Sequence, residues 1–205
     1  FNIYEYGVND PSLYISGINA VTGDITSPNH NLEVGDFVII SDVPEWPAGT
    51  TVTGKISKIT TNTINIGTIA AGTSGLITVL DNFEILTKRY NPFLNKGSKC
   101  RMNYMDMFID RTNTGEFTID YFVDETRVPI ETRTVKTSQN YGTTSPEEKM
   151  MQRVFTSTQG QFIQMKMYFS DAQMLTPAYQ TQDFKLHAMN LWMSDAGRIT
   201  SYDHI

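Results

Sequence analysis

Four aspartates fall in two neighbouring runs of alternating polar and apolar residues, and their spacing invites a catalytic or metal-binding interpretation. They are Asp106, Asp110, Asp120 and Asp124. Residues 102–110 and 116–124 are predicted to pair as one β-hairpin, so that each pair of aspartates shares a face. Carboxylates placed across a cleft can hydrolyse a glycosidic bond, and a row of them can bind Ca²⁺. The simpler interpretation, which we favour, is a solvated strand face whose charges discourage aggregation at sheet edges.

Other residue types used in catalysis are few. Of three histidines, His30 has no second ligand at metal-binding spacing, and His187 has the alternating neighbours of a satisfied sheet residue. Glu147 and Glu148 are adjacent, and adjacent carboxylates on a helix point in different directions. The sequence contains no Walker A loop, HExxH, GxSxG or paired CxxC motif. We therefore predict no catalytic residue, no metal site and no cofactor, and we expect a protein that is not an enzyme.

Composition narrows the classes of partner. The chain has 205 residues, is 40% hydrophobic and carries a net charge of −6, which indicates folded domains and disfavours a nucleic-acid-binding protein. Its basic residues near 88–101 are interrupted by Pro92 and Gly97, as in solvated loops. No apolar run approaches the ~18 residues of a membrane helix. The single cysteine, Cys100, excludes an internal disulfide; we expect it half-buried in a strand, although Lys99 and Arg101 could lower its pKa.

The elements that position these residues are predicted to be strands. Thr, Ile, Val, Tyr and Phe recur between frequent Gly, Pro and Asn turn signals, which is typical of an all-β protein. We predict a small SH3-like barrel or sandwich module followed by a larger antiparallel β-sandwich domain with one short helix. The expected segments are 1–12, a strand or linker entering from elsewhere in a longer polypeptide; 13–86, the small module; 87–98, a linker; and 99–205, the second domain.

Local signals refine this outline. Gly35-Asp36 is predicted to form a tight turn into the strand that follows, because Gly permits positive φ and Asp can bond its own backbone. Ser145, Pro146 and Glu148 are typical of a helix start, so we predict a helix over about 146–152. Residues 170–175 are expected to form a helical turn, and 184–193 the final strand.

Adaptable and aromatic side chains supply the candidates for recognition. All ten methionines follow position 101, where they either fill the core, which we favour, or form an interface. Four aromatic residues could contact a sugar or a protein partner. They are Trp46, Tyr141, Tyr179 and Trp192. Trp46 lies in a loop bounded by Pro44 and Pro47, where the ring either stacks on a ligand or anchors the loop.

Several stretches together resemble structural proteins of tailed-bacteriophage tails. The sequence "HNLEVGDFVIISDVP", followed by "TVTGKISKITTNTINI", resembles small β-modules of tail and baseplate proteins, with Asn31 where Gly is common. The stretches "RYNPF", "MDMFIDRTNTGEFTIDYFVDE", "QFIQMKMYFSD" and "DFKLHAMNLWMSDAGRI" are similar to domains of tail nozzle, hub and ring proteins. These stretches cover about half of the chain.

The resemblance implies a structural role in a virion tail. Its partners would be other tail proteins and copies of itself in a sixfold or twelvefold ring, assembled in the host bacterial cytoplasm, with DNA passing without sequence-specific binding. Contacts in such a ring join two different faces of the subunit. Two alternatives stay open: a carbohydrate- or receptor-binding module on a virion or cell surface, and a carboxylate-based hydrolase.

Overall fold

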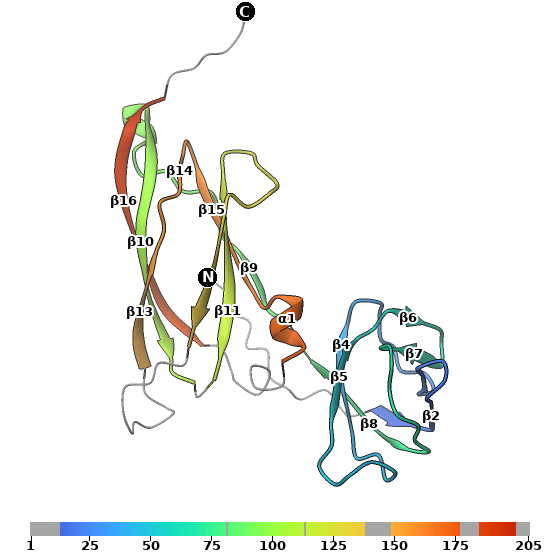
Figure 1. Ribbon diagram of the computed structural model, residues 1–205. Helices are drawn as coiled ribbons and strands as arrows, with labels where there is room; N and C mark the ends of the chain where they lie inside the picture. The colour runs from blue at the N-terminus through green and yellow to red at the C-terminus, as the bar shows by residue number, and fades with distance from the viewer. Residues whose placement is uncertain (1–12, 81, 113, 138–148, 177–184, 200–205) are drawn as a thin grey trace, which may run out of the picture. The chain divides into compact units, whose positions relative to one another are not determined.

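A computed structural model describes residues 13–80, 82–112, 114–137, 149–176 and 185–199 (Figure 1). Strands dominate, and the described residues contain one short α-helix and one 3-10 turn. The prediction of an all-β protein is therefore confirmed. The chain divides into two compact units, the first made of residues 1–82 with 174–180 and the second of residues 83–173 with 181–205.

The described residues of the first unit form eight short strands in two antiparallel sheets. The strands are β1 (Leu13–Ile15), β2 (Gly17–Asn19), β3 (Asp24–Thr26), β4 (Phe37–Ser41), β5 (Val52–Lys55), β6 (Lys58–Ile59), β7 (Thr63–Asn65) and β8 (Gly75–Leu80). One sheet has the order β1-β8-β4-β5 and the other β2-β3-β7-β6. Buried side chains from both sheets, mostly isoleucine, form one common core. β-branched residues suit this role because they pack well on a pleated surface.

The predicted turn at Gly35 feeds directly into β4. Gly35 has φ of 105°, a conformation that residues with a side chain rarely adopt. Its backbone N–H donates to the Ile56 carbonyl at 2.9 Å, and the Ile56 N–H donates to the Asp36 carbonyl at 2.8 Å. The Asp36 side chain accepts a bond from the Glu33 N–H at 2.8 Å. Gly35 and Asp36 are therefore structural residues of this turn, as predicted.

The second unit is a sandwich of two antiparallel sheets. Its elements are β9 (Glu84–Leu86), η1 (Leu94–Lys96), β10 (Ser98–Asp110), β11 (Glu116–Val123), β12 (Glu131–Lys136), β13 (Lys149–Phe155), β14 (Gln159–Gly160), β15 (Ile163–Tyr168) and β16 (Leu186–Arg198), and helix α1 (Asp171–Met174) follows β15. In the first sheet β10 pairs with β13, β14 and β16; the second has the order β12-β11-β15-β9. The core between them contains fully buried Met102, Met105, Met107 and Met165, so methionine serves mainly as core filling.

The boundary between the units lies earlier than the sequence predicted. Strand β9, expected to close the small module, pairs instead with β15 of the second unit. The expected linker 87–98 also belongs to this unit. The Thr87 N–H donates to the Met165 carbonyl at 2.9 Å, and Tyr90 and Ile163 exchange backbone hydrogen bonds. The turn residues of this segment do form a turn, but this turn is η1 and lies within the second unit.

Strands β10 and β11 form, but they do not form the predicted hairpin. Each lies in a different sheet of the sandwich, so the segment that joins them passes from one sheet to the other. At the crossing, Gly115 donates its N–H to the Thr112 hydroxyl at 3.0 Å and accepts a bond from the Thr137 N–H at 2.8 Å. A turn-like sequence between two strands is compatible with a hairpin or with a connection between two sheets. The alternation of polar and apolar residues predicts which side chains face the core, but not which strand is the hydrogen-bonding neighbour.

The predicted helix over 146–152 is also wrong for the part that is described. Residues 149–155 form strand β13, paired with β10 along its length; residues 145–148 lie outside the described residues. The second helical prediction is confirmed, because α1 occupies Asp171–Met174 within the expected turn. The final strand runs from Leu186 to Arg198, further than expected, and residues 1–12 lie outside the described residues.

Candidate interaction face on the β13–β10–β16 sheet

The four aspartates do not form a shared carboxylate row. Asp106 and Asp110 lie on β10, whereas Asp120 lies on β11 and Asp124 follows it in the other sheet. Asp120 is buried and accepts hydrogen bonds from the hydroxyls of Thr132 at 2.6 Å and Tyr168 at 3.0 Å. The prediction of an acidic hairpin face is therefore wrong, and with it the arrangement on which the hydrolase and Ca²⁺ interpretations depended.

The two histidines that are described are occupied by protein partners. His30 is buried; its Nε2 lies 2.8 Å from the Thr60 carbonyl and its Nδ1 accepts from the Leu32 N–H at 3.1 Å. The ring therefore carries its proton on Nε2 and has no lone pair left for a metal. His187 contacts Asp110 at 2.6 Å. Among the described residues, no group of three or more His, Cys, Asp or Glu side chains is placed to hold a metal ion.

Cys100 is fully buried, deeper than the half-buried position expected. Its Sγ lies 3.6 Å from the carbonyl oxygens of Tyr90 and Gly160. Burial raises the pKa of the thiol, which outweighs any influence of the neighbouring Lys99 and Arg101. The cysteine is a small apolar core residue and not a reactive thiol.

The structure describes two of the four aromatic candidates, and these two differ in exposure. Trp46 is only 9% exposed and donates its indole N–H to the Ala71 carbonyl at 3.0 Å, so it anchors its loop and offers no ring to a ligand. Tyr141 and Tyr179 lie outside the described residues. Of the two candidates that are described, Trp192 is the exposed one; it lies on β16 with 51% of its area exposed. It marks the outer side of the sheet made by β13, β10 and β16.

This outer side follows from the alternation along β10. The side chains of Met105, Met107 and Ile109 are fully buried in the sandwich core. The intervening residues point to the opposite side because successive strand residues alternate. They are Tyr104, Asp106, Phe108 and Asp110. Neighbours from the two flanking strands complete rows across the sheet, and we call the surface formed by Tyr104, Phe108, Met151, Phe155 and Trp192 the aromatic face.

The first row of the aromatic face is entirely aromatic. Tyr104 on β10 lies in register with Phe155 on β13 and Trp192 on β16. The Tyr104 and Trp192 rings stack with centroids 5.4 Å apart and planes 26° apart, and Phe155 lies tilted at 5.9 Å. Offset stacking of this kind stabilises a cross-strand row beyond the area it buries. The three rings form an aromatic ridge across the sheet.

A charged pair lies beside the ridge and compensates itself. Arg153 donates to Asp106 through Nε at 2.7 Å and through Nη2 at 2.9 Å, a bidentate contact. The guanidinium also lies over the Tyr104 ring, 4.3 Å from its centroid, and Trp192 donates its indole N–H to Asp106 at 3.2 Å. The Arg153 hydrogen bond is the main cause of a lowered Asp106 pKa, and the Trp192 bond lowers it further. Asp106 thus connects both outer strands to the central one.

A second apolar row lies four residues further along β10, beyond the row that contains Asp106. Met151 lies opposite Phe108, and Ala188 flanks it on the other strand. Met151 is 57% exposed and Phe155 is 65% exposed. Lys149, which pairs in register with Asp110, lies over the Phe108 ring at 5.9 Å. The Asp110 carboxylate at this end is contacted by His187.

No protein-family model matches the sequence, and a search of curated proteins found no match either.

Sequence reasoning found Trp192 but missed Tyr104, Met151 and Phe155 as surface residues. The sequence signal that could have found them is a strand with apolar residues on both of its faces, as in Lys149–Phe155. A strand with one face in a core needs only one apolar set. The second set is therefore free for contact with something else. Within the described part of the chain, no helix has the length and apolar character needed to cross a membrane.

Proposed function

We propose that this chain is a non-catalytic assembly protein, and that its aromatic face docks on a second copy of the chain. The observation that carries this proposal is the exposure of Met151, Phe155 and Trp192 on one side of a sheet whose other side is already buried in a core. Contiguous exposed apolar side chains mark sites of protein contact. Aromatic residues, Met and Arg are also the types enriched at interfaces.

Charge supports a second copy as the partner. The chain has a net charge of −6, so two copies repel each other over most of their surfaces. The aromatic face is different, because the Asp106 carboxylate between its two apolar rows is held by Arg153 in a bidentate pair. Beside the second row, Asp110 contacts His187 and lies in register with Lys149. Copies can therefore meet on this face at a lower electrostatic cost than the net charge implies, because the bidentate pair already satisfies the charges that contact would bury.

The biological setting that we propose is the tail of a bacteriophage virion, as a ring, nozzle or hub component. What supports it is the resemblance of the Asn31–Asp36 loop and of the strands in the second unit to tail proteins. The chain would then contact other tail proteins as well as its own copies. The ring would be sixfold or twelvefold, with DNA passing without sequence-specific contacts.

Carbohydrate binding is the alternative function that Trp192 supports, because its ring is half exposed. Sugars stack on an open aromatic face, however, and one face of Trp192 is occupied by Tyr104. The stacked arrangement therefore favours contact of the aromatic face with a protein over stacking of a sugar on Trp192.

Sedimentation velocity over a range of concentrations tests the docking proposal. We expect the intact chain to self-associate, and Phe155→Ser or Trp192→Ser to weaken that association by about tenfold or more. Tyr14→Ser is the matched control, because Tyr14 is an aromatic residue 77% exposed on β1 of the other unit. A chain that stays monomeric at every concentration, or face variants that associate as tightly as the control, would contradict the proposal. Circular dichroism confirms that each variant is folded.

Electron microscopy of the particle that contains the chain tests the tail assignment separately. A closed ring with cyclic symmetry, and this chain at the subunit contacts, is the expected result. A peripheral spike would contradict the tail assignment and leave the docking test to be judged alone.

A further inference from the structure

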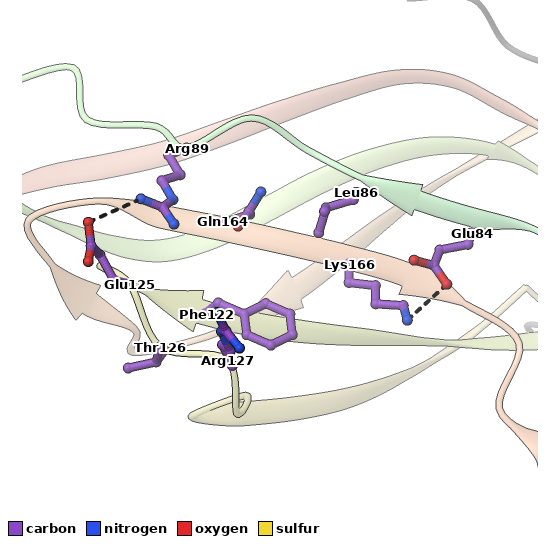
Figure 2. Close-up of a pocket in the computed structure, with 9 residues that line it drawn as sticks. All are labelled: Glu84, Leu86, Arg89, Phe122, Glu125, Thr126, Arg127, Gln164 and Lys166. Carbon is purple, nitrogen blue, oxygen red and sulfur yellow. Dashed lines mark ion pairs between the residues drawn. The ribbon is translucent and has the colours of Figure 1, made fainter.

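A second surface, on the opposite sheet of the same unit, forms a shallow groove of about 560 Å³. Its floor is the outer side of β11, β15 and β9, where Phe122 lies in register with Gln164, and Lys166 with Leu86. A wall is added by Arg89 and by the turn after β11. Figure 2 shows one ion pair at each end of the groove, with Gln164 between them.

The turn that carries the wall is held firmly. Asp124 adopts φ of 55°, and its side chain accepts the Phe162 N–H at 2.9 Å. The Thr126 hydroxyl donates to the Val123 carbonyl at 2.8 Å. These bonds fix the start of the loop that presents Glu125 and Arg127. The groove is therefore a formed feature of the second unit.

The groove carries more positive than negative charge. Its cations are Arg89, Arg127 and Lys166, and its carboxylates are Glu84 and Glu125, which leaves one surplus positive charge. Lys166 is held by Glu84 at 2.9 Å. Arg127 has no carboxylate partner among the residues that the structure describes. The sign of this local charge is opposite to the net charge of −6 carried by the whole chain.

The remaining ion pair is weak enough to exchange. Arg89 and Glu125 approach only to 3.9 Å, and the Glu125 side chain is 92% exposed. Exposed pairs at such a separation contribute little to stability, because water screens them. Arriving carboxylates can therefore take the Arg89 guanidinium from Glu125 and pair with Arg127, while Phe122 and Leu86 offer apolar contacts in the same groove.

We propose that this groove binds an extended acidic segment of a protein partner, with separate carboxylates on Arg127 and on Arg89 and apolar side chains on Phe122 and Leu86. The groove lies along paired strands, and alternating side chains of an extended segment match that geometry. The groove and the aromatic face lie on different sheets, so both surfaces can be occupied at once.

An NMR titration that follows the arginine Nε–Hε resonances tests the proposal. The probe is a short peptide of alternating glutamate and leucine, and the comparison peptide replaces glutamate with glutamine. We expect saturable shifts at Arg89 and Arg127 with the glutamate peptide only. Arg127→Gln should weaken binding about fivefold, and added salt should weaken it as well.

Arg101→Gln is the matched control, because Arg101 is exposed on β10, outside the groove. Equal weakening by Arg127→Gln and Arg101→Gln would show non-specific attraction and overturn the proposal. Equal shifts with inorganic phosphate would assign the groove to simple anions and overturn the acidic-segment proposal. Absence of any saturable shift with the glutamate peptide would overturn it too.

Discussion

Trp192 donates its indole N–H to the carboxylate of Asp106 at 3.2 Å, and the two residues lie on adjacent strands of the aromatic face. The chain has one other tryptophan, Trp46, whose indole N–H bonds a backbone carbonyl instead. One indole thus reports on a titrating group and the other does not. This difference gives a direct spectroscopic measure of the site.

The Trp192 indole resonance is expected to follow the ionisation of Asp106. Because Arg153 and Trp192 lower the Asp106 pKa, the midpoint of the resonance shift should lie below pH 3.8, the ordinary aspartate value. The ionised form contributes stability above the ordinary pKa, and this contribution is lost as the pH falls through the lowered one. Asp106→Asn should abolish the shift. Parallel movement of the Trp46 resonance would show general acid unfolding instead.

Glu131 is expected to join the two sheets of the sandwich. From β12 its carboxylate accepts the hydroxyls of Thr156 at 2.7 Å and Thr158 at 3.0 Å, which follow β13 of the other sheet. Glu131→Gln should lower the free energy of unfolding by about 1–2 kcal/mol. Chemical denaturation measures this. Glu125→Gln, at a fully solvated carboxylate, should change it by no more than about 0.5 kcal/mol.

The Glu131 contribution should also depend on pH. Burial by itself raises the Glu131 pKa, but the hydrogen bonds from Thr156, Thr158 and Arg133 outweigh it and lower the pKa. The stabilisation is therefore present above the ordinary glutamate pKa and is lost as pH falls through the lowered value. The stability gap between the intact chain and Glu131→Gln should narrow in acid, and a gap that widens would contradict this assignment.

Two tyrosines of the second unit should respond oppositely to loss of their hydroxyls. The Tyr121 hydroxyl is buried without a hydrogen-bond partner among the described residues, which costs about 1–3 kcal/mol of desolvation. The Tyr168 hydroxyl donates to Asp120. We expect Tyr121→Phe to preserve or raise the unfolding free energy and Tyr168→Phe to lower it by about 1 kcal/mol. A clear loss with Tyr121→Phe would indicate a bound water on that hydroxyl.

Gly115, at the crossing between the sheets, should tolerate no side chain. A methyl group there would meet the hydroxyl oxygens of Thr112 and Thr137, the first at 2.5 Å. Gly115→Ala should destabilise the second unit by about 1–3 kcal/mol, measured by thermal unfolding. Gly17→Ala is the control, because nothing lies within 4 Å of its added carbon and its φ is not positive. Equal effects of the two substitutions would argue against crowding at the crossing.

The sequence predicted the strands of the second unit better than their partners. Alternation in β11 correctly placed Phe117, Ile119 and Tyr121 in the core. It also suggested a solvated opposite side, yet Thr118 and Asp120 are buried there. The Thr118 hydroxyl bonds Gln173, and Asp120 bonds Thr132 and Tyr168. These contacts come from segments distant in sequence, which local periodicity does not register.

The strand that was mistaken for a helix shows why the candidate site was hard to find. In Lys149–Phe155, alternate residues are exposed. Because Met151 and Phe155 occupy exposed positions, the hydrophobic pattern loses its period of two, and the preceding Ser145-Pro146 start signal then favours a helix. The feature that obscured the strand is the same one that makes the aromatic face.

The pairing of β10 also has a consequence for how the chain folds during synthesis. Its partners come from residues 149–155, 159–160 and 186–198, all made after β10 itself. Until the ribosome has released β16, one whole edge of this thirteen-residue strand lacks its partner. The second unit therefore folds late, and a nascent chain halted before residue 198 would expose β10 to chaperones or to a neighbouring chain.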